Sequence, residues 1–552
     1  MIGNIYNKVK GLGVVAAVAL LLTACSDFLD TPSKSSIPAD EAYGKASSVD
    51  MNLTGVYGAL KPFATYYFVM SEFRSDNMFE TTESKNNEYA DCSQFNAVGL
   101  LNDNIVKNCW ADHYKLIAAA NTLIDRMGEA PDLTAATAVQ YQAEARFLRA
   151  LSYFDLVRFF GRVPMSLHEM TPDEAFQLAQ SEAADIYSQV IVPDLEYAVD
   201  NLADEAVDYS GSKRPERVTK TAAKALLGKV YLQMAGYPFS LTMGDADQQT
   251  LKDKAKALFQ EVLNGYAQYW APTIDDWNRM WIHENDNKYF IFEIQYIAEK
   301  NQGNPAAWLS RGSNTRADYF CGANLTAGPH VYVERGLQDY FLSNYSEDED
   351  GVRTYTDQRL YNSLNIAEYY DEEDGQMKGG VSEGSNNFLP KFFEHKLKRS
   401  KYGYSDMDAT IIDRTCWPQN WPVLRIEDVM LLYAELEGNT TEGYKYLNLI
   451  RQRAGLPAVS ELSKDVFQDR VAFERRVELL GEGQRWFDEV RHNTFVNDIT
   501  TMMLNYRDNY DASHSNNYLI YANRITQNAA LYPIPLSQMR VREGLYQQNP
   551  GY

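Results

Sequence analysis

The chain is poor in the residues that build metal, redox and disulfide chemistry. Only five cysteines and seven histidines occur in 552 residues, and no two cysteines form a C-x-x-C pair. A chain of this length with so few cysteines is not a disulfide framework. A bridge between Cys92 and Cys109 is one alternative, and buried free thiols at Cys92, Cys109, Cys321 and Cys416 are the default. Because the histidines are scattered, we expect neither a metal site nor a cofactor.

Positive charge and long apolar runs are also scarce. The chain has 52 Lys and Arg against 75 Asp and Glu, a formal net charge of −23. Such a field repels phosphate backbones, so nucleic acid is not an expected partner. Beyond residue 24 no run of apolar residues is long enough to cross a bilayer. At 45% hydrophobic and 23% charged residues, the chain otherwise has the composition of a globular protein with a substantial core.

The N-terminus has the pattern of an export signal. Lys8 and Lys10 precede the apolar stretch 11–23, which is well short of the ~20 residues that a spanning helix needs. The stretch ends in Leu22-Thr23-Ala24-Cys25, which resembles a bacterial lipobox, where the cysteine is acylated and begins the mature chain. We therefore predict a signal peptide over 1–24 and lipidation of Cys25. The alternative is an ordinary signal peptide with an incidental cysteine at its edge.

Helical periodicity dominates both ends of the mature chain. Apolar residues recur at helical spacing from Val139 to Phe160 and stop before Gly161. A partner helix is predicted over 176–202, with a kink or break at Pro193. Further helices are predicted over 218–236, 251–264, 423–437 and 442–454, and over 464–492 with interruptions near Gly481 and Gly483.

The pair formed by 218–236 and 251–264 matches part of the tetratricopeptide pattern. Gly228 and Ala255 supply the small residues that let two helices approach, and Tyr231 and Phe259 supply rings that fill the groove between them. Residues 265–422 differ, because they contain clusters of Gly, Asn, Asp and Ser and two acidic loops. We predict a single mainly α domain over 25–552. Its helical scaffold covers about 39–264 and 423–552, and a loop-rich ligand face covers about 265–422.

Two motifs that suggest chemistry lack the context it needs. Residues 380–384 match G-x-S-x-G, but no apolar strand precedes them and no helix follows. Residues 346–357 partly match a calcium loop, but they lack the first-position Asp and the bidentate Glu. Both are interpreted as solvated loops, and we expect no catalytic residues.

Aromatic residues are the informative candidates for binding. Four of the eight tryptophans, Trp270, Trp277, Trp281 and Trp308, fall within 270–308. An exposed ring beside polar side chains packs against the C–H face of a sugar while its neighbours bond the hydroxyls. Trp308 has the most loop-like polar surroundings. The predicted glycan-binding residues are Trp308, Trp281, Trp277, Tyr319, Tyr66 and Tyr89. The alternative for each is the core, as expected for Trp110 and Trp486 in their helical patterns.

Several long segments resemble one family. Residues 143–164 read AEARFLRALSYFDLVRFFGRVP, residues 425–436 RIEDVMLLYAEL, and residues 485–491 RWFDEVR; LYPIPLSQMR and NPGY follow near the C-terminus. With Cys25 followed by SDFLD, the chain resembles the SusD/RagB family of Bacteroidetes outer-membrane lipoproteins. The resemblance implies a fold of tetratricopeptide-like helix pairs with a loop-rich ligand face, exposed at the cell surface.

The resemblance also implies a function. A member of this family captures oligosaccharides, without cleaving them, for a SusC-like TonB-dependent transporter. The same scaffold capturing peptides is the alternative, and a secreted glycan-processing enzyme is the second. The motifs that carry the resemblance belong to the scaffold, so they leave the ligand open.

Overall fold

The computed structural model describes ten stretches of the chain. They are residues 42–80, 89–282, 288–309, 331–349, 353–364, 369–371, 376–378, 391–392, 416–511 and 515–552. The predicted signal peptide, Cys25, Cys321 and the G-x-S-x-G segment lie outside them. None of the helices in these stretches combines the length and apolar composition that a bilayer span requires.

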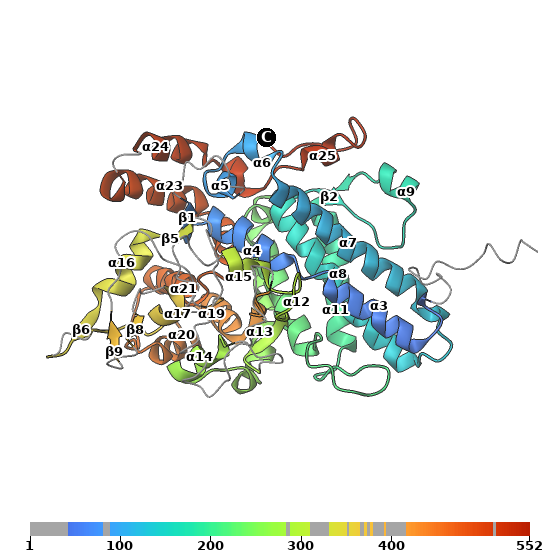
Figure 1. Cartoon of the computed structure of the whole chain (residues 1–552), viewed down its shortest axis with the longest axis horizontal. Coiled ribbons are helices and arrows are strands. Elements are labelled where there is room, and N and C mark those ends of the chain that lie inside the picture. The colour runs from blue at the N-terminus through green and yellow to red at the C-terminus, as the bar shows by residue number, and fades with distance from the viewer. Residues whose placement is uncertain are drawn as a thin grey trace, which may run out of the picture.

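Long helices stacked side by side form the N-terminal half (Figure 1). In chain order the helices of this half include α3 (Ala46–Gly58), α4 (Phe63–Ser71), the single turns α5 (Ala90–Ser93) and α6 (Ala97–Leu100), α7 (Asn104–Arg126), α8 (Ala135–Phe160), α11 (Val192–Asn201), α12 (Lys220–Met234) and α13 (Asp245–Leu263). From α7 onward, each long helix packs on the one before it. The helix predicted over 139–160 is α8. It begins four residues earlier, where the Thr134 side chain accepts a hydrogen bond from the Thr137 N–H, and Gly161 ends it at φ 71°.

The partner helix predicted over 176–202 is wrong in its first part. That segment contains α9 (Pro172–Gln177), strand β3 (Gln180–Ser181) paired with β2 (Val163–Pro164), and α10 (Ala183–Ile186) before α11. The predicted break at Pro193 is absent, because a π-helical turn at Tyr187–Ile191 leads directly into α11. Pro193 lies in the first turn of α11, where a missing N–H costs little.

The α12–α13 pair has the packing that the tetratricopeptide pattern predicts. Phe259 is fully buried, and a Cβ placed on Gly228 would lie 2.5 Å from its Cε1 atom. No side chain fits at residue 228 at this helix spacing, so the glycine allows the close approach.

The stack continues into the C-terminal part, where α19 packs on α13, α20 and α21. The helices there are α19 (Ile426–Glu437), α20 (Thr441–Arg453), α21 (Lys464–Glu478), α22 (Arg485–His492), α23 (Phe495–Asn505), α24 (Ser515–Arg524) and α25 (Leu536–Met539). Gly481 and Gly483 have φ of 85° and 75° and separate α21 from α22. The predicted interruption is therefore confirmed.

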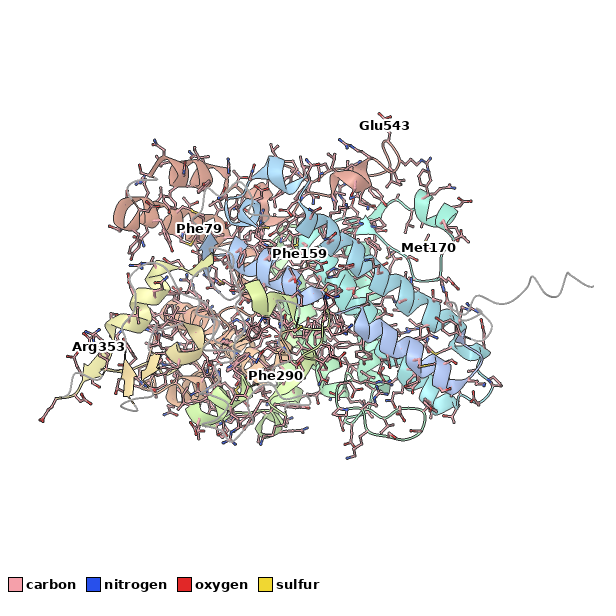
Figure 2. The ribbon with its side chains drawn as sticks, viewed as in Figure 1. Phe79, Phe159, Met170, Phe290, Arg353 and Glu543 are labelled. Carbon is pink, nitrogen blue, oxygen red and sulfur yellow. The ribbon has the colours of Figure 1, made fainter. Side chains whose placement is uncertain are left out.

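Between α13 and α19 the described residues form only short elements. The helices are α14 (Ile274–Met280), α15 (Pro305–Leu309), α16 (Arg335–Ser343) and α17 (Leu360–Ser363). The strands pair antiparallel: β4 (Phe290–Ile294) with β10 (Trp421–Arg425), β1 (Met78–Glu80) with β5 (Val331–Val333), β6 (Tyr345–Glu347) with β7 (Arg353–Tyr355), and β8 (Tyr369–Asp371) with β9 (Gln376–Lys378). The β6–β7 hairpin projects at one edge of the molecule, where Arg353 is labelled in Figure 2.

The helices share one continuous core. Trp110 and Trp486 are buried in it, as predicted. Cys92, Cys109 and Cys416 are buried free thiols, so the alternative of a Cys92–Cys109 bridge is wrong.

The C-terminal segment returns to the N-terminal helices. The buried Arg74 donates hydrogen bonds to the Ala529 carbonyl (2.8 Å) and the Tyr552 hydroxyl (3.1 Å). Asn549 donates to the carbonyls of Phe160 and Tyr532 at 2.9 and 2.7 Å. Residues 529–552 thus close the core around Arg74.

Candidate ligand-binding site

Trp277 and Trp281, at the end of α14, are core residues. Their exposed fractions are 0% and 3%, and the Trp277 Nε1–H donates to Glu478 Oε1 at 3.2 Å. Neither ring has a free face for a sugar, so the prediction of glycan binding is wrong for both. A tryptophan in an irregular polar stretch is buried here because the following strand β4 and the helix α21 cover it.

A buried charge network surrounds these two rings. The Lys391 Nζ lies 4.9 Å from the centroid of the Trp281 ring and 5.6 Å from that of Trp277. The network consists of Asp357, Arg359, Lys391, Arg425, Glu427, Arg453, Glu474, Glu478 and Glu482, all buried. It links α17 and strand β10 of the middle region to helices α20 and α21.

Glu478 is the centre of this network. Arg425 and Arg453 donate to its Oε1 at 2.8 and 2.6 Å, and Arg359 lies 3.3 Å from its Oε2. Burial alone would raise the pKa of Glu478, but Arg453, Arg425, Arg359 and Lys391 together lower it below the usual range. Glu478 therefore stays ionised. Removing one partner of such a buried pair leaves an uncompensated charge, at a cost of about 3–5 kcal/mol.

Tyr66 on α4 is also buried, with 3% of its surface exposed. Its hydroxyl bonds to Asp112 on α7, and its ring lies beside Phe63 and His113. Burial, with further contributions from Cys109 and Asp112, raises the pKa of the hydroxyl well above the usual value. The predicted role of Tyr66 in ligand binding is therefore wrong, because the ring packs between two scaffold helices.

Of the other three predicted residues, only Tyr89 has a described side chain. Tyr89 is half-buried and packs edge-on against Phe73, with 6.4 Å between ring centroids. Trp308 lies on α15, a short helix that packs against α4, but its side chain is outside the described residues, as is all of Tyr319.

Strands β1 and β5 bring two distant parts of the chain together. In this ladder Glu80 lies opposite Val331 and Met78 opposite Val333. Beyond the ladder, the Glu334 N–H donates to the Asn77 carbonyl at 2.8 Å. In the sequence, Tyr89 follows the end of β1 by nine positions, and Trp308 and Tyr319 precede the start of β5 by 23 and 12 positions.

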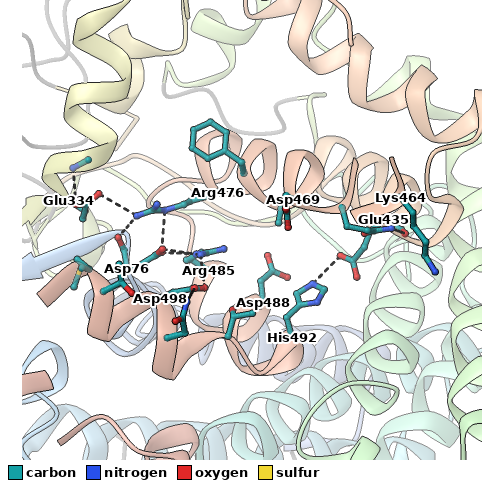
Figure 3. Close-up of a pocket in the computed structure, with 18 of the residues that line it drawn as sticks. Asp76, Glu334, Glu435, Lys464, Asp469, Arg476, Arg485, Asp488, His492 and Asp498 are labelled. Carbon is teal, nitrogen blue, oxygen red and sulfur yellow. Dashed lines mark hydrogen bonds and ion pairs between the residues drawn. The ribbon is translucent and has the colours of Figure 1, made fainter. Parts of the chain in front are cut away.

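A large polar cleft of about 1390 Å³ opens on the C-terminal helices (Figure 3). Its walls are one face of α21 and one face of α23, with α13 and the end of α19 at one end and the start of α16 at the other. Nine acidic and five basic residues line it: Asp76, Asp253, Glu334, Glu435, Glu437, Asp469, Asp488, Asp498 and Asp508, with Lys252, Lys256, Lys464, Arg476 and Arg485. Sequence reasoning missed this cleft, because its residues come mainly from six helices, α13, α16, α19, α21, α22 and α23, and from the segment before β1.

Asp76 forms the closed end of the cleft. Arg485 donates to its two carboxylate oxygens at 2.7 and 2.9 Å, and Arg476 lies 3.2 Å away. Burial raises the pKa of Asp76, but Arg476 and Arg485 outweigh burial and lower it below the usual range. Arg476 also contacts Glu334 at 3.5 Å (Figure 3). Arg476 thus links Asp76, just before β1, to Glu334, directly after β5.

One buried group has the residues of a nucleophilic triad. Cys109 Sγ lies 3.7 Å from His113 Nδ1, and His113 Nε2 lies 3.4 Å from Asp155 Oδ2. All three are fully buried, and His113 Nδ1 already bonds to the Cys109 carbonyl at 2.7 Å. Burial, then Asp155 and Asp112, raises the pKa of the thiol well above its usual value. A reactive cysteine needs the opposite shift and access to substrate, so this group is structural.

Comparison with known proteins identifies the class. A family model described as "SusD family" matches residues 289–552, and one described as "Starch-binding associating with outer membrane" matches residues 27–232. The chain is 25% identical over 521 residues to SusD-like protein P38 of Formosa agariphila, covering 89% of this chain and 93% of that protein. It is 24% identical over 524 residues to a SusD-like protein of Bacteroides ovatus, covering 92% and 86%.

Solved structures agree with this class. A SusD homologue of Bacteroides thetaiotaomicron superimposes with a TM-score of 0.71 at 22% identity, covering 92% of this chain and 97% of that one. A laminarin-binding SusD-like protein superimposes with a TM-score of 0.66 at 23% identity, covering 92% and 100%. The mainly helical fold is that of the SusD superfamily. The protein belongs to the SusD/RagB family, as the sequence resemblance indicated.

Proposed function

We propose that the mature chain is a lipid-anchored protein of the cell surface that captures oligosaccharides without cleaving them. It delivers them to a SusC-like TonB-dependent transporter. The observation that carries this proposal is family membership over both halves of the chain, one half matching a family described as starch-binding and associated with the outer membrane. A structural neighbour named for laminarin binding supports a glycan as the ligand.

The proposed ligand contacts are the three candidates whose rings the described residues do not place in the core. They are Trp308, Tyr319 and Tyr89, in the sequence that flanks the β1–β5 ladder. Support for binding without cleavage comes from the descriptions of the matching family and of a structural neighbour, which name binding. Each ring stacked on a sugar should contribute about 1–3 kcal/mol, by analogy with bases stacked on aromatic rings.

The test is titration calorimetry with laminarin and starch oligosaccharides. The Trp308→Ala variant should bind the ligand about 5- to 150-fold more weakly than the wild type. Tyr345→Ala is the matched control, because Tyr345 is an exposed ring, 40% accessible, on the projecting β6–β7 hairpin. Circular dichroism checks that both variants fold.

Three outcomes would contradict parts of the proposal. Equal affinity of Trp308→Ala and wild type would remove Trp308 from the site. Capture of oligopeptides but of no glycan would replace the ligand class. Release of reducing sugar ends by the wild-type protein would replace binding with catalysis.

A further inference from the structure

Two polar helix faces meet across the cleft without packing together. On α21 the lining residues are Lys464, Gln468, Asp469, Ala472, Phe473 and Arg476, and on α23 they include Asn497, Asp498, Thr501 and Asn505. The spacing of three and four residues puts each set on one face of its helix. Facing helices in a core bury apolar stripes, whereas these faces remain polar and apart. The gap is therefore a built part of the fold.

The dimensions of the gap suit an extended chain. Lys464 and Arg476 are twelve positions apart on α21, which corresponds to about 18 Å of helix. An extended polypeptide rises about 3.3 Å per residue, so about five residues match this length. The volume of about 1390 Å³ also exceeds the roughly 300–1,000 Å³ of a small-molecule pocket. Concave surfaces between stacked helix pairs are typical sites for such segments.

The charge of the gap favours a basic occupant. Acidic residues outnumber basic ones among its lining residues, nine to five. Asp253 on α13 and Asp469 on α21 are exposed, and neither forms an ion pair with a cation in the described part of the chain. They offer carboxylates that an arriving Lys or Arg can pair with.

A buried carboxylate behind the closed end also favours a basic occupant. Glu489 is 1% exposed, and its Oε2 has no hydrogen-bond partner within the described stretches. Carboxylate oxygens of Glu489, Asp76 and Asp498 lie within 4.8 Å of one another, and Arg485 is the cation that contacts all three. Arg476 is a second cation at this end and contacts Asp76 and Glu334, so two arginines face four carboxylates. Burial raises the pKa of one of them, Glu489, well above its usual value. Since the Arg485 guanidinium already stands among Asp76, Glu489 and Asp498, the arrangement does not favour a metal ion.

The apolar part of the lining also matches such a ligand. Phe473 is half-buried in the cleft wall, and Met502 and Leu504 lie on the opposite wall. A guanidinium stacks on an aromatic ring, and the aliphatic stems of Lys and Arg cover apolar surface. An oligosaccharide is less well matched, because Phe473 is the one Phe, Tyr or Trp among the described lining residues.

We propose that this cleft is a second binding site, for an extended segment of about five residues bearing Lys or Arg, supplied by a protein partner. The segment lies between α21 and α23, and its cations pair with Asp253, Asp469 and the acidic closed end near Asp76. None of the proposed glycan contacts is among the lining residues of the cleft, so the failure of either proposal leaves the other standing.

Peptide titration of the mature chain tests this site. The probes are a capped six-residue peptide that alternates arginine with serine and a matched peptide with glutamate in place of arginine. The arginine peptide should bind, and its affinity should fall as salt rises, while the glutamate peptide should not bind. The Asp253→Asn/Asp469→Asn double variant should bind the arginine peptide about 2- to 30-fold more weakly, since each exposed pair contributes little.

Two further variants make the test specific. Asp465→Asn is the matched control, because Asp465 is exposed on α21 but is not among the lining residues, and it should leave affinity within about twofold of wild type. Ala472→Trp fills the middle of the α21 wall and should abolish binding. If the added indole perturbs folding, the Asp253→Asn/Asp469→Asn double variant still tests the site, because both residues are exposed.

The proposal is overturned by equal binding of the two peptides or by no binding of either. An Asp465→Asn effect as large as that of the double variant would also overturn it, because binding would then reflect net charge alone. Loss of glycan binding in Ala472→Trp, with no peptide bound by the wild type, would assign the cleft to the glycan instead.

Discussion

Single buried carboxyl groups make the stability of this acidic protein depend on pH. Glu144 on α8 is fully buried, and its Oε2 accepts a hydrogen bond from the Tyr57 hydroxyl at 2.8 Å. Burial raises its pKa to about 7, although Arg217, Tyr57 and Gln140 oppose the shift. Burial likewise raises the pKa of Glu72 to about 7. In the folded state both groups therefore hold a proton that they lose in the unfolded chain above about pH 4.5.

This linkage predicts that the free energy of unfolding falls as pH rises from about 4.5 to 7. In that window the folded state binds more protons than the unfolded state, so the slope is negative. Glu144→Gln keeps the shape of the side chain and cannot ionise. The variant should lose the part of the fall in unfolding free energy that Glu144 contributes, up to about 3 kcal/mol between pH 4.5 and 8.

Urea denaturation at pH 5, 6, 7 and 8 measures this effect. Glu543→Gln is the control, because Glu543 is exposed and lies at the molecular edge in Figure 2, so its slope should match the wild type. An unchanged slope for Glu144→Gln would mean that Glu144 is ionised in the folded state.

Helix pairs form the scaffold at the scale of elements, and α12 and α13 approach closely at Gly228. Gly228→Ala adds a methyl group where 2.5 Å separates the new Cβ from Phe259. Overpacking costs about 1–3 kcal/mol, which exceeds the ~1 kcal/mol that alanine gains over glycine in a helix. The variant should therefore be less stable, despite the better helix former.

Gly55→Ala on α3 is the matched control. No atom lies within 4 Å of a Cβ built at residue 55, so this variant should be more stable by about 0.5–1 kcal/mol. Phe259→Leu in the Gly228→Ala background should recover part of the loss, as a thermal double-mutant cycle would detect. Equal melting shifts for Gly228→Ala and Gly55→Ala would show that the two helices separate readily.

The same elements show which parts of the fold can be predicted from the sequence. Helices such as α8 and α12 were predictable because their apolar spacing repeats over many turns. The segment before α11 was not, since the short strand β3 is stabilised by its partner β2 and not by its own periodicity. The buried tryptophans were missed for a related reason. Trp277 and Trp281 stand among polar neighbours, and only Glu478, about 200 positions away, reveals that they face a charged core.

At the scale of the whole molecule, the proposed anchor and partner can be tested together. Cys25→Ala expressed in the native host should lack the lipid mass and leave the membrane fraction, since stable anchoring requires acyl chains. Mild detergent extraction of the wild type should recover a TonB-dependent barrel with it, identified by mass spectrometry. An unchanged membrane pellet for Cys25→Ala would contradict lipidation. Extraction of this protein alone, alongside intact complexes of other envelope proteins, would contradict the partnership.

Closure of the core around Arg74 has a consequence for the order of folding. Arg74 receives its partners from residues 529–552, more than 450 positions later in the chain. While the ribosome is still making the middle of the protein, this guanidinium has no carbonyl or hydroxyl from that segment and retains its water. Contacts between such distant residues form slowly. The first helices therefore complete their burial only after synthesis of the C-terminal segment.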